Sequence, residues 1–271
     1  MMEKITRIPL EGLYNTRDLG GLKSSDNHRV RPCRLIRSGM LSDMTEKDQH
    51  TLTHTYRLKN IIDFRTLNEQ AESPDPSIPG VSHISNPILE DMTAGITHDE
   101  ESDRQLSLGE ATITMKERGI DPSDYMKQMY EDIITSEYSL SQYRQFFDIL
   151  SSQTDGATLW HCSAGKDRVG IGTAMLLYIL GIDMNTIMED YMMTGVFLKE
   201  EVDRIIDGLS HKIKDSSALE SIRICMGVKE EYLKSVFQIM ENTSGSIRRF
   251  LQDKVGLDGG KTDALKALYL E

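Results

Sequence analysis

The pattern of apolar and polar positions divides the chain into a first part of short strand-like segments and a later part with helical periodicity. Residues 34–39 (RLIRSG), 59–65 (KNIIDFR) and 81–88 (VSHISNPI) are short, apolar and bounded by turn residues, which predicts strands. Between the first two, Ser42 or Thr45 can cap a helix, because Asp48 follows Thr45 at capping-box spacing.

Helical periodicity becomes strong after residue 120. Asp121 and Pro122 suit the cap and first turn of a helix over 121–136. Apolar side chains then recur at helical spacing: Tyr125, Met126, Met129, Tyr130, Ile133 and Ile134. Residues 139–150 repeat this pattern, with Ser139 and Gln142 at capping-box spacing, and predict a second helix.

Further along, residues 156–160 (GATLW) predict a short buried strand, and 169–180 predict a buried helix ended by Gly181. Residues 182–271 predict helices packed on the core, with a break at 242–246. Strands that alternate with helices favour an α/β fold with a mostly parallel central sheet flanked by helices.

We expect one domain over residues 1–271. The three prolines of residues 73–80 predict a loop. Residues 90–120 are polar and acidic without a clear period, which favours a surface insertion or lid.

Charge narrows the classes of partner. The net charge is −12, from 43 acidic and 31 basic residues. Such a chain repels nucleic acid and anionic membranes at long range, so we expect no nucleic-acid partner and no stable membrane association. An anionic ligand must be held by a local site. No apolar run is long enough to span a bilayer, and the first residues lack a signal-peptide core. These features predict a cytoplasmic location, or a secreted one if the chain is a trimmed mature form.

The cysteine content argues against a disulfide framework or a zinc site. The three cysteines, Cys33, Cys162 and Cys225, are few and scattered, which fits free thiols in a reducing compartment. We therefore expect neither a metal nor another cofactor.

Candidate chemistry concentrates in residues 160–170 (WHCSAGKDRVG), between the strand and the buried helix. Ligands of open α/β sheets bind beyond the carboxyl ends of strands, and the unpaired N–H groups of a helix start attract anions. A nucleotide-binding Walker loop requires glycine at Trp160 and serine or threonine at Asp167, so that motif is absent.

Cys162 and Arg168 instead suit a loop that wraps a tetrahedral oxyanion. The backbone amides from Ser163 through Ala164, Gly165 and Lys166 to Arg168 can point inward while the guanidinium binds two oxygens. Surroundings of this kind lower the pKa of a cysteine and favour attack on phosphorus by a thiolate, giving a thiophosphoryl intermediate. The alternative is a buried cysteine with a structural role.

The motifs HCSAGKDR (161–168), NTRDLGG (15–21) and IIDFRTLNE (61–69) together resemble the atypical dual- and triple-specificity protein tyrosine phosphatases of bacteria, as does MEDYMMTG (188–195). The resemblance implies a phosphotyrosine-phosphatase-like fold, with Cys162 as nucleophile and Arg168 as phosphate clamp. It makes His161 a residue that orders the loop, and not a metal ligand. It also implies phosphotyrosine, phosphoserine, phosphothreonine and phosphoinositides as candidate substrates, on phosphorylated proteins or lipids.

Two carboxylic acids are candidates for the general acid. Asp167 lies between Lys166 and Arg168, whose charges favour its ionised form, although a bound phosphate dianion opposes this effect. Asp63 ends a strand and can also reach the loop, or can pair with Arg65 or Arg17. We favour Asp167, with Asp63 in support.

Other residues of these motifs have expected supporting roles. Lys166 at the rim favours ligands with more than one phosphate, unless it is simply a solvated lysine. Asn15, Arg17 and Asp18 are expected to brace a turn near the loop.

Two other functions compete with a cysteine-dependent phosphatase. The first is a phosphate-binding module with little turnover, which Val169 favours. The second is a sulfur-transferring enzyme resembling rhodanese, whose loop is typically one residue shorter.

Val169 leads to a kinetic prediction. Related phosphatases carry threonine or serine after the arginine, and its hydroxyl stabilises the thiolate as it leaves. Valine cannot donate a hydrogen bond, so we expect slow hydrolysis of the thiophosphoryl intermediate and a burst of product in rapid mixing. Val169→Thr is expected to speed steady turnover. A linear time course together with an unchanged rate in this variant contradicts the prediction.

Overall fold

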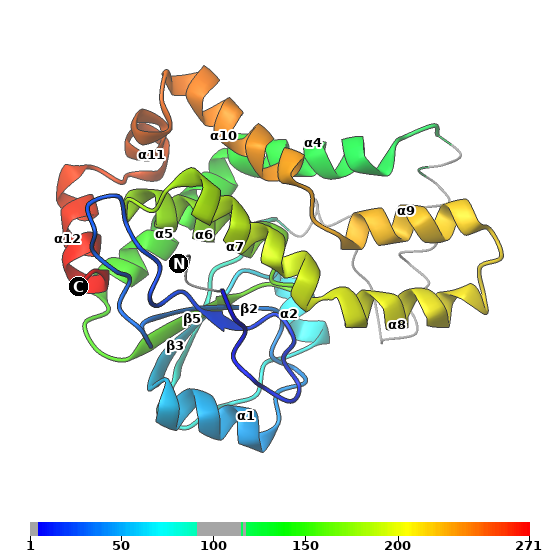
Figure 1. The fold of residues 1–271 in the computed structure, drawn as a ribbon, viewed down its shortest axis with the longest axis horizontal. Coiled ribbons are helices and arrows are strands. Elements are labelled where there is room, and N and C mark those ends of the chain that lie inside the picture. Colours follow the sequence, from blue (N-terminus) through cyan, green and yellow to red (C-terminus); the bar gives the residue numbers. More distant parts are fainter. Residues whose placement is uncertain (1–4, 91–114, 116–117) are drawn as a thin grey trace.

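The computed structural model describes residues 5–90, 115 and 118–271. Its centre is a five-stranded sheet in the order β1-β2-β5-β3-β4 with helices on both faces (Figure 1). The strands are β1 (Arg17–Asp18), β2 (Leu35–Ser38), β3 (Leu58–Asp63), β4 (Ser82–Ser85) and β5 (Ala157–His161). Only β1 runs antiparallel to its neighbour among these strands. The predicted α/β class with a mostly parallel sheet is confirmed.

Helices alternate with the strands from β2 to β5, and among the described elements only helices follow β5 along the chain. They are α1 (Glu46–His50), which continues as the π-helix η1 (Thr51–Thr55), α2 (Leu67–Glu72), α4 (Pro122–Thr135), α5 (Glu137–Ser152), α6 (Asp167–Ile179), α7 (Met184–Phe197), α8 (Lys199–Ser210), α9 (Ser216–Met226), α10 (Glu230–Ser244), α11 (Ile247–Val255) and α12 (Gly259–Tyr269). None of the helices in the described part of the chain has the length and apolar content needed to cross a bilayer.

Most local signals correspond to the observed element boundaries. Thr45 forms the capping box of α1 with Asp48, and the Asp121 side chain accepts hydrogen bonds at the start of α4. Gly181 and Gly245 have positive φ angles just after α6 and α10, where a left-handed residue ends a helix. The predicted strands and the break at 242–246 are therefore confirmed.

The structure differs from the sequence prediction at two helices, and one predicted segment lies mainly outside the described residues. Helix α5 is capped by Ser136, not Ser139, because the helix begins at Glu137 and Ser139 instead donates to the Ile88 carbonyl. Helix α2 follows β3 after three residues, in a stretch for which the sequence pattern predicted no element. The insertion expected at 90–120 falls mainly outside the described residues.

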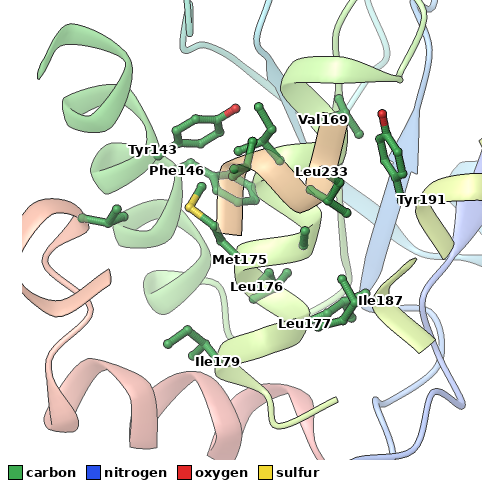
Figure 2. Close-up of a cluster of buried hydrophobic side chains, with 14 of the residues drawn as sticks. Tyr143, Phe146, Val169, Met175, Leu176, Leu177, Ile179, Ile187, Tyr191 and Leu233 are labelled. Carbon is green, nitrogen blue, oxygen red and sulfur yellow. The ribbon is translucent and has the colours of Figure 1, made fainter. Parts of the chain in front are cut away.

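The central strands β2 and β5 are buried on both faces, as is usual in parallel sheets. On one face, Leu159 of β5 packs with Ile36 and Ile61. On the other, Trp160 lies in the larger core with α5, α6 and α10. Helix α6 is buried over most of its surface, and Figure 2 shows side chains from Val169 to Ile179 surrounded by neighbouring helices. Burial of α6 from Val169 onward holds the first turn of the helix beside the end of β5.

A buried ion-pair cluster joins the N-terminal segment to α7. Asp190 of α7 contacts Arg17 Nε at 2.7 Å and Arg37 NH1 at 2.5 Å, and all three side chains are almost fully buried. Burial raises the pKa of Asp190, but the two guanidinium groups outweigh that effect and hold the pKa below its ordinary value. Asp190 is thus ionised between two arginines. Because both arginines are buried, water cannot compensate their charge if Asp190 is removed.

We predict that Asp190→Ala destabilises the protein by about 3 kcal/mol or more, because it leaves two buried guanidinium groups without a counter-charge. Urea unfolding measures this difference. Asp203→Ala is the matched control, since Asp203 pairs with Lys199 and Arg223 at the surface. The control is expected to lose less than about 1 kcal/mol. Equal losses in the two variants contradict the prediction.

Candidate active site

The loop between β5 and α6 begins at Cys162 and ends at Lys166, the N-cap of α6. Gly165 adopts φ +68°, and a Cβ atom there would lie 2.3 Å from the Ser38 carbonyl oxygen. Both the positive φ and this close approach to β2 require glycine. The chain can therefore turn tightly from strand to helix against its neighbouring strand.

Three carbonyl groups of the loop point away from its centre, and each accepts a hydrogen bond from a neighbouring segment. Ser163 O accepts from Met40 N, Ala164 O from Asn15 Nδ2, and Gly165 O from Arg37 NH2, each at 2.9 Å. In a trans peptide the N–H points opposite to the C=O. The N–H groups of residues 164–166 consequently face the opposite side of the loop, where an anion can accept from them.

Arg168 lies in the first turn of α6 and is held by a carboxylate that the sequence analysis did not identify. Its NH1 and NH2 atoms contact Glu69 Oε2 and Oε1 at 2.6 and 2.9 Å. Longer contacts run to Ser163 Oγ (3.2 Å) and the Phe64 carbonyl (3.4 Å). The Nε–H group takes no part in these contacts. Glu69 thus anchors the Arg168 guanidinium. The longer contacts to Ser163 and Phe64 are weaker, and a phosphate oxygen can replace those acceptors.

Glu69 also completes the capping box of α2 with Thr66. Burial raises the pKa of Glu69, but hydrogen bonds from Arg168 and the Arg168 charge outweigh this and lower the pKa to about 2. For Arg168, burial acts to lower the pKa, while the same pairing raises it above its ordinary value. Both groups are therefore charged at neutral pH.

Asp167 is the first residue of α6, and its side chain is 21% exposed. Its Oδ1 atom accepts a hydrogen bond from Tyr130 Oη at 2.6 Å and lies 3.5 Å from Lys166 Nζ. Asp167 lines the same cavity as Cys162 and Arg168. The structure thus brings together the three residues that the sequence predicts as nucleophile, phosphate clamp and general acid.

Lys166 differs from both alternatives in the sequence analysis. It is only 4% exposed, and its Nζ donates to the carbonyl oxygen of Cys225 at 2.5 Å, near the end of α9. The amine is therefore neither solvated nor held out at the rim. It ties the loop to α9.

His161 lies behind the loop and is fully buried. Its Nε2 is 2.9 Å from Asp75 Oδ2, and its Nδ1 is 3.3 Å from the Cys162 carbonyl oxygen. Burial raises the pKa of Asp75, but the hydrogen bond from His161 and the charges around it, including that of Arg65, together lower the pKa below its ordinary value. His161 therefore connects the backbone of Cys162 to a buried carboxylate.

Asp63 is placed away from the cavity lining. Both of its carboxylate oxygens accept from Arg65, with Arg65 NH2 to Asp63 Oδ2 at 2.7 Å. This is the pairing considered as the alternative to a catalytic role. Asp63, Asp75 and His161 bring potential metal ligands within 4.8 Å of one another. Arg65 NH2 also contacts Asp75, at 2.9 Å, so a guanidinium already supplies the positive charge there.

The remaining motif residues lie around the loop. Asn15 Oδ1 accepts from Arg17 NH1 at 2.6 Å, so the amide that binds the loop is itself oriented by Arg17. Asp18 instead accepts from the backbone N–H groups of Cys33 and Gly20. Val169 is fully buried in the core.

A cavity of about 1060 Å³ opens in front of the loop. Cys162, Ser163 and Ala164 line it together with residues 166–168. Its opposite walls carry apolar side chains of α4, α8 and α9, among them Met129, Val202 and Met226. The cavity therefore combines the anion-binding groups of the loop with a wide, partly apolar wall.

Sequence reasoning assigned no functional role to Glu69, Asp75, Tyr130 or Asp190. Glu69 did carry a local signal, because Thr66 and Glu69 have capping-box spacing. The other three are joined to the loop by tertiary contacts between distant segments, which local sequence patterns do not reveal.

An α/β sheet with a cysteine, an arginine and a helix start around one anion site is typical of an enzyme that acts on phosphate esters. The sequence profile of the tyrosine phosphatase family matches residues 8–271. The chain belongs to this family, and it is a hydrolase of the protein tyrosine phosphatase class.

Individual relatives are distant but cover much of the chain. The triple specificity protein phosphatase PtpB of Mycobacterium tuberculosis is 25% identical over 278 aligned positions, covering 96% of this chain and 98% of the relative. A protein of Cupriavidus necator that is named as a putative tyrosine-protein phosphatase is 25% identical over 258 aligned positions, covering 93% of this chain and 85% of the relative. A tyrosine-protein phosphatase of Nostoc commune is 29% identical over 60% of this chain and 49% of its own.

The depressed pKa of Glu69 gives a prediction about stability and pH. Because the folded-state pKa of about 2 lies below the ordinary 4.5, ionised Glu69 stabilises the folded state above about pH 4.5, and this contribution fades as the pH falls toward 2. We expect Glu69→Gln to be less stable than the wild type by about 2 kcal/mol at pH 7, with a difference that narrows below pH 4.5.

Urea unfolding at pH 7, 5, 4 and 3 measures this difference. Glu241→Gln, at an exposed position of α10, is the control and is expected to match the wild type throughout. A constant gap at all four pH values, or none at pH 7, shows that the Glu69–Arg168 pair does not stabilise the fold as described.

Proposed function

We propose that this protein hydrolyses phosphate monoesters through a thiophosphoryl intermediate on Cys162. The observation that carries the proposal is the loop itself. Its carbonyl groups are bound from behind, so its N–H groups face a cavity that Cys162 and Arg168 also line. Inward amides and a guanidinium are the donors that stabilise the charge of a phosphoryl group in transfer.

In the first step, the amides and Arg168 hold the non-bridging oxygens of the substrate. The Cys162 sulfur attacks phosphorus in line, the sulfur–phosphorus bond forms and the bond to the leaving oxygen breaks. Asp167 donates a proton to that oxygen. Asp167 has this role rather than Asp63, because Asp167 lines the cavity whereas both oxygens of Asp63 are engaged by Arg65.

In the second step, water replaces the departed alcohol or phenol. Asp167 takes a proton from the water as its oxygen attacks phosphorus. The sulfur–phosphorus bond breaks, inorganic phosphate forms and the thiolate is regenerated. Val169 offers no hydroxyl to this thiolate, which is the feature favouring a phosphate-binding module with little turnover as the second candidate.

The substrate class in this proposal is phosphotyrosine, with phosphoserine, phosphothreonine and phosphoinositides as wider candidates. A preference for several phosphates through Lys166 requires its amine to leave the Cys225 carbonyl first, since that contact is buried. The loop in its present form therefore favours a single phosphate. The single domain and the cytoplasmic location stay predictions from the sequence.

We expect Cys162→Ser to abolish hydrolysis of 4-nitrophenyl phosphate, because a serine hydroxyl is a far weaker nucleophile than a thiolate. Cys33→Ser is the matched control and is expected to keep wild-type turnover, since Cys33 lies outside the cavity lining. Iodoacetamide at neutral pH is expected to modify Cys162 faster than Cys33 or Cys225, and inorganic phosphate to protect it.

Retained turnover in Cys162→Ser overturns the covalent mechanism. Phosphate protection of Cys162 without any turnover in the wild type favours the phosphate-binding module. Equal modification rates of the three cysteines, with no protection by phosphate, remove the anion site altogether.

A further inference from the structure

A hydrogen-bonded pair of buried tyrosines ends on Asp167. Tyr130 of α4 is fully buried, and its hydroxyl lies 2.6 Å from Asp167 Oδ1 and 2.7 Å from the hydroxyl of Tyr191 in α7. The Tyr130 ring also packs against Tyr191 and against Tyr232 of α10. Three helices thus fix the position of one phenol beside the candidate acid.

The direction of these hydrogen bonds follows from the inventory of protons. An ionised carboxylate only accepts, so the single hydroxyl proton of Tyr130 goes to Asp167. Tyr191 then donates to the Tyr130 oxygen. Burial, followed by the charge of Asp167, raises the pKa of both tyrosines well above the ordinary value. Both phenols consequently keep their protons and act as fixed donors.

Both contacts of the Asp167 carboxylate found in the described residues fall on the same oxygen. Tyr130 and Lys166 approach Oδ1, while Oδ2 makes no such contact. Lys166 attracts the carboxylate by charge at 3.5 Å but does not fix its rotation. The short bond from Tyr130 supplies that orientation.

We propose that Tyr130, supported by Tyr191, is a positioning residue that holds Oδ1 of Asp167 so that Oδ2 carries and transfers the proton in the cavity. The inference rests on the proposed function, in which Asp167 protonates the leaving oxygen. It concerns the proton-transfer part of catalysis, because Tyr130 is buried behind Asp167 and touches neither Cys162 nor Arg168 in the contacts described.

The test compares leaving groups that differ in their need for a proton. Phenyl phosphate releases a basic phenolate and requires the acid, whereas 4-nitrophenyl phosphate releases a stable anion. We expect Tyr130→Phe to lower kcat/KM for phenyl phosphate roughly 10- to 100-fold and for 4-nitrophenyl phosphate by less than about 3-fold. kcat/KM reports steps up to cleavage of the ester bond, so slow hydrolysis of the intermediate does not mask the difference.

Tyr191→Phe is expected to show the same preference with a smaller loss, and it tests the proposal independently if Tyr130→Phe folds poorly. Tyr269→Phe is the matched control, because this buried hydroxyl donates to the Leu150 carbonyl far from the cavity. In an Asp167→Asn background, Tyr130→Phe is expected to cause no further loss on phenyl phosphate, as residues acting through one group are not additive.

Equal fold losses on both substrates, or a full additional loss in the Asp167→Asn background, overturn the positioning role and leave Tyr130 as a packing residue. Absence of phosphatase activity in the wild type, or its persistence in Cys162→Ser, overturns the proposed function instead. The two failures are therefore distinguishable.

Discussion

The orientation of three carbonyl groups decides what the loop after β5 can do. Met40, Asn15 and Arg37 each donate to one of them, and the peptide geometry then turns the following N–H groups toward the cavity. Without these donors, the carbonyl dipoles would be free to face an incoming anion and repel it. The proposed anion site therefore depends on hydrogen bonds to the carbonyl side of the loop, which leave its N–H side to a ligand.

Buried carboxylates hold the arginines around the loop in place. Asp190 fixes Arg17 and Arg37, and Glu69 fixes Arg168. In a chain of net charge −12, the guanidinium groups near the loop are held in place by largely buried acids. Such pairs contribute little net stability but strongly disfavour any state in which one partner is lost. They serve to define a single geometry for the loop and its clamp.

The sequence allowed four of the five strands, the helices α4, α5 and α6, and the position of the loop between a strand and a helix to be predicted, because these follow from local spacing. Asp121, Thr45 and Gly181 each act within a few residues of the boundary that they define. The environment of Lys166 was not predictable, because a carbonyl near the end of α9 decides it. The pairing of Asp63 with Arg65 was considered from the sequence, but the second contact of Arg65, with Asp75, was not. Side-chain partners set by tertiary packing leave no periodic trace in the sequence.

The residues that brace the loop are also spread along the chain, and this affects how the protein matures. Asn15 and Arg37 precede the loop, whereas Asp190 follows it in α7. During ribosomal synthesis, Cys162 leaves the exit tunnel before the carboxylate that locks the two arginines. A nascent chain that stops short of α7 therefore carries the thiol without its finished pocket, and competence for chemistry arises only late in translation.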